Sequence, residues 1–157
     1  MNEFQESLED LMLEKSLSHN KLAIALGISK STMSTYFTNN YYPAIDIAIK
    51  MCKLFDCSLD YLFGLSDQRK SIYCVNDTDI MANFVNNLEH ILHSNNISIA
   101  KFTRDLKISE FTYYRWRHGM FPKTINLISI AKYFNLSLDY LLGHKLEKSC
   151  WVFNCYF

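Results

Sequence analysis

The chain has 157 residues, of which 49% are hydrophobic, 15% aromatic and 20% charged. This composition supplies ample apolar side chains for packed cores and excludes a disordered chain, and the length fits one domain or two small ones. Sixteen Lys and Arg residues balance 16 Asp and Glu residues, so the charge of the whole chain at first argues against a nucleic-acid partner.

Glycine and proline are scarce, with 4 and 2 residues, and neither interrupts a long apolar run. The sequence therefore predicts an all-α protein. No run of 18 apolar residues occurs, and the acidic, polar start MNEFQESLED is unlike a signal peptide. We expect a cytoplasmic protein with no membrane partner.

Apolar residues at helical spacing predict five helices in the first part of the chain. Ser18, Ser29 and Ser58 stand where side-chain caps are needed, and Gly27 and Gly64 end the apolar stripes that precede them. The predicted helices span residues 2–15, 19–26, 30–37, 44–55 and 59–63.

Residues 18–43 read SHNKLAIALGISKSTMSTYFTNNYYP and predict a helix, a tight turn and a second helix. One side of the second helix is apolar and is formed by Met33, Tyr36 and Phe37. The opposite side is small and polar and is formed by Lys30, Ser31, Ser34 and Thr35. A helix with a core side and an open, hydroxyl-rich side is the layout of a DNA-reading helix-turn-helix.

The sequence repeats with an offset of 80 residues, which falls to 79 after one deletion. SLDYL at 58–62 recurs unchanged at 137–141, and Pro43 corresponds to Pro122. The second copy predicts helices at residues 78–93, 99–106, 110–117, 125–134 and 138–142. We therefore expect one domain at 1–66, a linker at 67–77, a second domain at 78–145 and an apolar tail at 146–157.

The two copies differ in charge. Residues 1–67 hold 5 Lys and Arg and 9 Asp and Glu, a net of −4, whereas residues 81–157 hold 9 and 5, a net of +4; residues 68–80 hold 2 of each. The polar connector 65–78 has fourteen residues and can stretch about 46 Å at roughly 3.3 Å each. That reach spans half-sites about 34 Å apart, so one chain acting as its own pseudo-dimer is an alternative to a homodimer.

The stretches LAIALGISKSTMSTYFTNN and LFDCSLDYLFG, with Pro43 between them, closely resemble the Cro-and-phage-repressor type of helix-turn-helix domain, also called the xenobiotic-response-element type. FTRDLKISEFTYYRWRHGMFP and YFNLSLDYLLG resemble the same family independently. The resemblance implies two tandem five-helix lambda-repressor-like domains. It also implies a sequence-specific transcription regulator of bacterial or phage type that binds double-stranded DNA.

Carried over residue by residue, the resemblance places base-reading positions on the second helix of the first copy and phosphate contacts around it. His19 stands where the family often has a phosphate-binding Gln, and Asn39 stands where it favours Gly. The residues of the first copy that we expect to contact DNA are His19, Lys21, Lys30, Ser31, Thr32, Ser34, Thr35, Asn39 and Asn40.

The second copy has a different open face, with Glu110 at its start and aromatic residues among its cations. Its predicted DNA-contacting residues are Phe111, Thr112, Tyr114, Arg115, Arg117, His118 and Lys123. Two exposed rings fit thymine methyl groups, but they also fit a dimer or partner interface, and both interpretations stay open. Tyr113 and Trp116 match core positions of the first copy.

The five cysteines lack a Cys-x-x-Cys pair. Cys52 and Cys57 fall at apolar helical positions, so we expect reduced core thiols; a zinc site at Cys150 and Cys155 with His144 would lack a second ligand pair. No nucleophile elbow, phosphate loop or metal constellation occurs, so we expect no enzyme and no cofactor. The alternative function is a protein-binding module of antitoxin or anti-repressor type, and a nucleic-acid-processing enzyme has no residue pattern in its favour.

Overall fold

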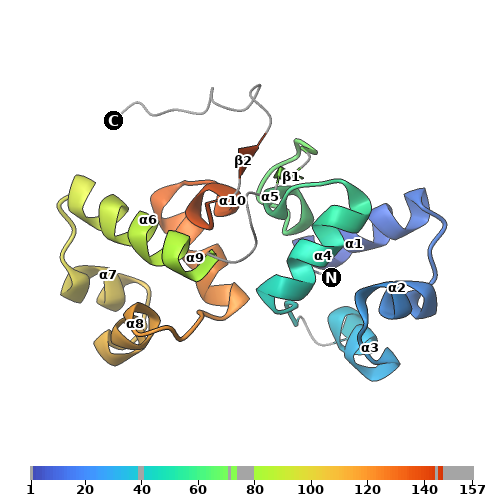
Figure 1. Cartoon of the computed structure of the whole chain (residues 1–157), viewed down its shortest axis with the longest axis horizontal. Helices are drawn as coiled ribbons and strands as arrows, with labels where there is room; N and C mark the ends of the chain where they lie inside the picture. The colour runs from blue at the N-terminus through green and yellow to red at the C-terminus, as the bar shows by residue number, and fades with distance from the viewer. Residues whose placement is uncertain (1, 39–40, 71, 74–79, 144, 147–157) are drawn as a thin grey trace. The chain divides into compact units, whose positions relative to one another are not determined.

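The computed structural model describes residues 2–38, 41–70, 72–73, 80–143 and 145–146. Within these residues the chain forms two compact units, which are described one at a time. Of the described residues, unit 1 holds 2–38, 41–70, 72 and 146, and unit 2 holds 73, 80–143 and 145. The first five helices lie in unit 1 and the next five in unit 2 (Figure 1).

The helices of unit 1 are α1 (Glu3–Glu14), α2 (His19–Leu26), α3 (Lys30–Thr38), α4 (Ile45–Phe55) and α5 (Leu59–Leu62). All of them except α4 begin at side-chain caps, and α4 follows Ala44, which has no side chain that could cap it. Asn2 and Gln5 form a reciprocal capping box at the start of α1, with both side-chain to backbone distances at 2.9 Å. Ser18 and Ser58 cap α2 and α5, as the sequence predicts. Each cap satisfies an amide that would otherwise lack a partner.

The core of unit 1 forms where α2 packs on α3 and α4, and where α5 packs on α1 and α4. The ring of Phe4 is fully buried and contacts the rings of Tyr36, Tyr42 and Phe63 at centroid distances of 6.2, 6.0 and 5.6 Å. Burying a ring of this size contributes about 1.5–3 kcal/mol. These contacts attach α1 to α3 and to the end of α5.

The segment after α5 is attached to unit 1 through Arg69, which lies in the predicted linker. Its guanidinium forms an ion pair with Glu14 over 2.5 Å and donates to the carbonyls of Asp56, over 3.3 Å, and Phe55. These carbonyls belong to the carboxyl end of α4, where cations are favoured by the helix dipole. Arg69 therefore joins the ends of α1 and α4.

Unit 2 has its own set of helices and its own aromatic core. The helices are α6 (Ile80–Ser94), α7 (Ile99–Asp105), α8 (Glu110–Arg117), α9 (Thr124–Phe134) and α10 (Leu138–Leu141). Phe84 and Phe102 are fully buried, and Trp116 packs edge-on against Phe84 at 5.8 Å. The predicted core positions of Tyr113 and Trp116 are confirmed, since they are 5% and 2% exposed.

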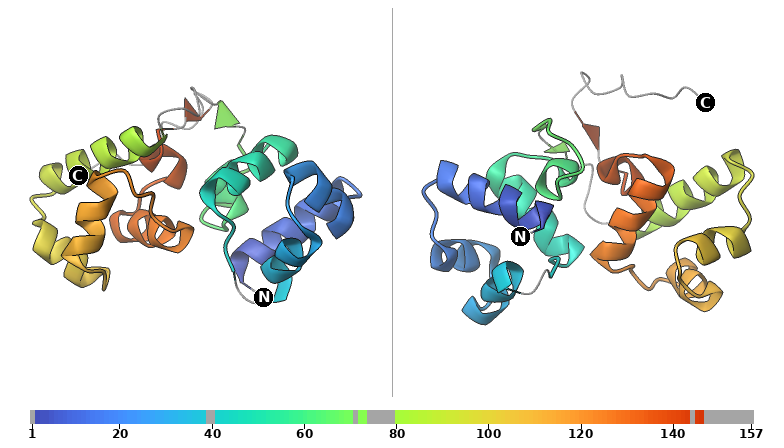
Figure 2. Two further views of the ribbon diagram at one scale, coloured as in Figure 1. Left: turned by 60° about the horizontal axis from the view of Figure 1, so that its bottom comes forward. Right: turned by 180° about the vertical axis from the view of Figure 1, so that it is seen from behind.

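The all-α prediction is confirmed, because in the part of the chain that the structure describes helices account for the regular structure apart from one short pairing of strands, β1 (Ile72–Tyr73) with β2 (Lys145–Leu146). Further views show the helical build of each unit (Figure 2). The helix ends agree with the predicted ones to within one residue, except the start of α6, because residues 74–79 lie outside the described part. Among the described residues no helix is long and apolar enough to cross a membrane.

Candidate nucleic-acid interface

The candidate interface of unit 1 consists of α2, α3 and the turn between them. The side chain of Ser18 accepts from the backbone of Lys21 over 3.4 Å and starts α2. Gly27 ends α2 with a φ of 69°, in the left-handed region that favours glycine. The amide of Ile28 donates to the carbonyl of Ala23 over 3.0 Å and closes the turn. The predicted tight turn between the two helices is confirmed.

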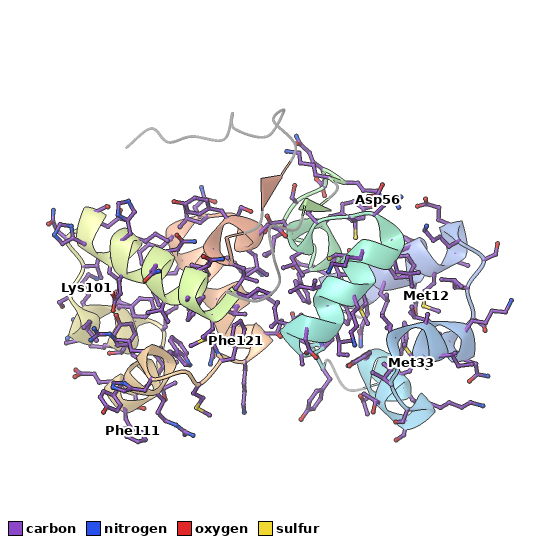
Figure 3. All side chains as sticks on the ribbon, viewed as in Figure 1. Met12, Met33, Asp56, Lys101, Phe111 and Phe121 are labelled. Atoms are coloured by element: carbon purple, nitrogen blue, oxygen red, sulfur yellow. The ribbon has the colours of Figure 1, made fainter. Side chains whose placement is uncertain are left out.

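Helix α3 has one buried face and one exposed face. Met33 and Tyr36 are 1% and 5% exposed, and Met33 points from α3 toward the interior of unit 1 (Figure 3). The exposed residues of α3 include four predicted contacts, Lys30, Ser31, Thr32 and Ser34. Thr35, which the sequence places on the open side, is half-buried. Phe37, which the sequence places on the core side, is half-buried as well.

Two of the predicted contact residues on α3 already use their hydroxyl groups within the helix. The Oγ1 atom of Thr32 is hydrogen-bonded to the Oγ atom of Ser29 over 2.8 Å, and the hydroxyl of Thr35 donates to the carbonyl of Thr32 over 2.7 Å. Thr35 therefore offers a base its methyl group and an acceptor rather than a donor. The exposed hydroxyls of Ser31 and Ser34 are the better candidates for donation.

His19 lies at the first position of α2, and its ring stacks on the ring of Phe37 at 4.2 Å and 18°. This stacking restricts the imidazole and leaves it exposed at the start of α2, beside α3. Lys21, two residues further along α2, is exposed too. Both residues are thus available at the start of α2, where helix amides favour an anion.

In unit 2, helix α8 exposes aromatic rings where α3 exposes hydroxyls. Phe111 and Tyr114 are 67% and 53% exposed, and Phe111 projects outward from α8 (Figure 3). Their rings are parallel to within 14°, with centroids 6.2 Å apart, and Tyr114 stacks on His118 at 3.9 Å. The guanidinium of Arg115 lies over the Phe111 ring at 5.9 Å.

Several predicted contacts of α8 have partners inside unit 2. Arg117 forms an ion pair with Glu89 of α6 over 2.7 Å, and Nδ1 of His118 is hydrogen-bonded to the carbonyl of Tyr114 over 2.8 Å. Thr112 is half-buried and its hydroxyl is hydrogen-bonded to the side chain of Ser109. Lys123, at the start of α9, is exposed. Arg115 and Lys123 are therefore better placed than Arg117 to reach a ligand.

Helices α2 and α3 of unit 1 lie in a segment that matches a known family. Residues 7–68 match the family model of the Cro/C1-type HTH DNA-binding domain. The matched segment takes in α2, α3 and the turn at Gly27, so the chain contains a Cro/C1-type domain there.

A protein of Bacillus subtilis (strain 168), named as an uncharacterized HTH-type transcriptional regulator, YobD, is 32% identical over 62 residues. The aligned region covers 40% of this chain and 55% of that relative, so the chain spans about half the length of the curated relative it matches. No solved structure matches the chain significantly.

The charges within the Cro/C1-type domain are separated along the sequence. No Asp or Glu occurs between Glu14 and Asp46, whereas Lys15, Lys21 and Lys30 all fall in that interval. The acidic residues that give the first 67 residues a net charge of −4 therefore lie before α2 and after α3. Helices α2 and α3 together are therefore mildly basic. The sequence contains this signal, but it shows only when the charge is counted over the helix-turn-helix instead of over the whole domain.

Sequence reasoning missed one residue that supports the interface. Gln5 is 2% exposed, and its Nε2 atom donates to the carbonyl of Tyr36 in α3 over 2.7 Å. A Gln in a first helical turn normally indicates a solvent-exposed cap, so its sequence position carried no signal of this contact.

The remaining predicted sites have different outcomes. Cys52 and Cys57 are buried thiols, as expected. Asn39 and Asn40 lie outside the described residues, and so do His144, Cys150, Cys155 and the tail from 147 on. In the described part of the chain no three His, Cys, Asp or Glu side chains are grouped so that they could hold a metal ion.

Proposed function

We propose that the protein is a transcription regulator whose Cro/C1-type domain reads double-stranded DNA with the exposed face of α3. The observation that carries this proposal is the division of α3 between buried Met33 and Tyr36 and exposed Lys30, Ser31 and Ser34. The family match to residues 7–68 supports the partner, and the name of the Bacillus relative supports regulation.

The chemistry of this face fits a major groove. Lys30 can donate to guanine O6 and N7, the serine hydroxyls can donate to or accept from base edges, and the methyl of Thr35 can contact a thymine methyl. His19 and Lys21 at the start of α2 would contact phosphates, which position the domain without reading sequence. The three lysines between Glu14 and Asp46 supply the local positive charge that phosphates require.

We further propose that the protein represses transcription by occupying a promoter. Steric occlusion requires only that the operator be bound more tightly than other DNA, and it requires no catalytic group. The alternative, a protein-docking module of antitoxin or anti-repressor type, is favoured by the net charge of −4 on residues 1–67 and by the exposed aromatic face of α8.

The test begins by selecting DNA bound by the full chain from a random duplex pool. The affinity of the selected sequence is then measured by fluorescence anisotropy for the wild type, for Lys30→Ala, and for a matched control, Lys50→Ala, which removes an exposed lysine of α4. If Lys30 contacts a base, we expect Lys30→Ala to lose about 1–3 kcal/mol of binding free energy and to relax the selected sequence at one position. The control should bind like the wild type.

A salt titration separates the two functions. The logarithm of DNA affinity should fall linearly with the logarithm of salt concentration, because bound phosphates release counterions. Unchanged affinity in a triple variant that combines Lys30→Ala, Ser31→Ala and Ser34→Ala would exclude α3 as the reader.

A further inference from the structure

Helix α8 carries a surface that the proposed function leaves unused. We call it the α8 patch, and it consists of Glu110, Phe111, Tyr114, Arg115 and His118. We propose that the α8 patch is a homodimer interface, in which α8 of one chain packs across a two-fold axis against α8 of a second copy.

The first argument is the apolar content of the patch. Two of its rings, Phe111 and Tyr114, are 67% and 53% exposed although they lie on one helix of eight residues. An exposed pair of large rings has an unfavourable contact with water that a second surface removes. Tyr, Phe and Arg are the residues enriched at the centres of protein interfaces, whereas DNA offers few apolar groups to such a pair.

The second argument is that the patch is already ordered in one chain. The rings of Phe111 and Tyr114 are parallel, His118 stacks on Tyr114, and the Arg115 guanidinium lies over Phe111. Side chains held in place before association lose less conformational entropy when a partner binds. The patch therefore has less to lose on binding than a set of mobile side chains would.

The third argument is the placement of the two opposite charges of the patch, which favours a second copy of this chain as the partner. Glu110 and Arg115 are five residues apart, which at 100° per residue places them about 140° apart, on opposite edges of the patch with both rings between them. A two-fold axis through the middle of the patch can bring Glu110 of each copy to Arg115 of the other. Such self-complementarity is what an isologous contact requires, and the paired charges sum to zero.

The same charges weigh against DNA at this helix. Glu110 opens α8 at the position where Lys30 opens α3, and a carboxylate there repels phosphates. Arg117, the neighbouring cation, is held by Glu89 on α6. Pairing of unit 2 in this way would join two copies of the Cro/C1-type domain, so the preferred operator would contain two equivalent half-sites.

Sedimentation equilibrium of the full chain, under reducing conditions so that cysteines cannot link copies, tests the proposal. A single short helix face gives a small interface, below roughly 1,200 Å² in total, and so a weak dimer; the concentrations should reach about 1 mM. We expect Glu110→Arg and Arg115→Glu each to raise the dimer dissociation constant about 10-fold or more. The double variant, Glu110→Arg with Arg115→Glu, should restore it, because both cross-copy pairs are re-formed with reversed sign.

A charge reversal outside the patch, Asp67→Arg, is the matched control, since Asp67 is exposed in unit 1, and circular dichroism confirms the helicity of each variant. Three outcomes would overturn the proposal: a wild type that stays monomeric throughout, a double variant as monomeric as the single ones, or a dimer that Phe111→Ala leaves unchanged. If Phe111→Ala abolishes DNA binding while the chain is monomeric, α8 reads DNA instead.

Discussion

The buried amide of Gln5 donates a hydrogen bond to the backbone carbonyl of Tyr36 over 2.7 Å and so ties the first turn of α1 to the end of α3. In unit 2 the residue that follows Phe84, as Gln5 follows Phe4, is Val85, which has no side-chain amide to donate such a hydrogen bond. There α8 is tied to α6 by the ion pair of Arg117 with Glu89. The two exposed helices are thus supported by different chemistry, neutral and buried for α3, charged and exposed for α8.

Replacing Gln5 by Ala should destabilise the chain and weaken DNA binding together. The Tyr36 carbonyl would lose its donor in a buried place, which costs about 1–3 kcal/mol. Urea unfolding followed by circular dichroism measures the loss, and anisotropy with the selected operator measures the affinity. Gln68→Ala, at an exposed position, should change neither, and a Gln5→Ala protein as stable as the wild type would contradict the role of this hydrogen bond.

Removing the ion pair of unit 2 should have a smaller, salt-dependent effect. The side chains of Arg117 and Glu89 are 50% and 41% exposed, so water and salt screen their attraction. A double-mutant cycle with Arg117→Ala and Glu89→Ala should give a coupling of about 0.2–1 kcal/mol that falls as salt is added. Fluorescence of the buried Trp116 can follow unfolding of unit 2 in a Trp151→Phe background. A coupling that is unchanged at high salt would contradict this account.

Local rules predict the helices of this protein well because caps and apolar spacing act within a few residues. Ser18, Ser29 and Ser58 cap their helices as expected, and the apolar stripe of α3 places Met33 and Tyr36 in the core. Contacts between distant residues leave no such pattern. The bond of Gln5 to Tyr36 joins residues 31 apart, and that of Arg69 to Glu14 joins residues 55 apart.

The candidate site was predicted less fully, for the same reason. Spacing places Thr35 on the open face, but its half-buried side chain and its hydroxyl bond to Thr32 depend on packing and rotamer. Likewise, Arg117 looks available in the sequence, and only the fold brings Glu89 within 2.7 Å of it.

Lowering the pH should remove the contribution of Asp105 to the stability of unit 2. Hydrogen bonds from Lys101 and from Tyr133, both 2.7 Å long, hold the pKa of Asp105 below its usual value of 3.8. A carboxyl whose pKa is lower in the folded state stabilises the fold above its unfolded pKa, and this contribution is lost as the pH falls below about 4 through the folded pKa. Asp105→Asn should therefore melt slightly below the wild type at pH 7.

The difference in melting temperature between the wild type and Asp105→Asn should vanish in acid. The wild-type carboxyl is then protonated and therefore as uncharged as the amide of the variant. Melting curves of both proteins between about pH 7 and pH 2 provide the measurement, since that range spans the titration of Asp105. Tyr133→Phe, which removes one of the two donors, should give an intermediate result. A gap in melting temperature that persists at the lowest pH would show that Asp105 acts through packing instead of charge.

Two glycines with the same backbone angle should respond very differently to substitution by alanine. Gly27 and Gly64 both have a φ of +69°, so each alanine would pay for the left-handed conformation, about 1–2 kcal/mol. A Cβ at Gly27 would meet nothing within 4 Å, whereas a Cβ at Gly64 would lie 2.5 Å from the Cβ of Glu3. Because that atom is fixed to α1, the overlap can be relieved only by moving α1 and α5 apart, at a further cost of about 1–3 kcal/mol. Urea unfolding should therefore give Gly64→Ala a much lower free energy of unfolding than Gly27→Ala. Equal losses of this free energy would show that the close approach of Glu3 to Gly64 does not constrain the fold.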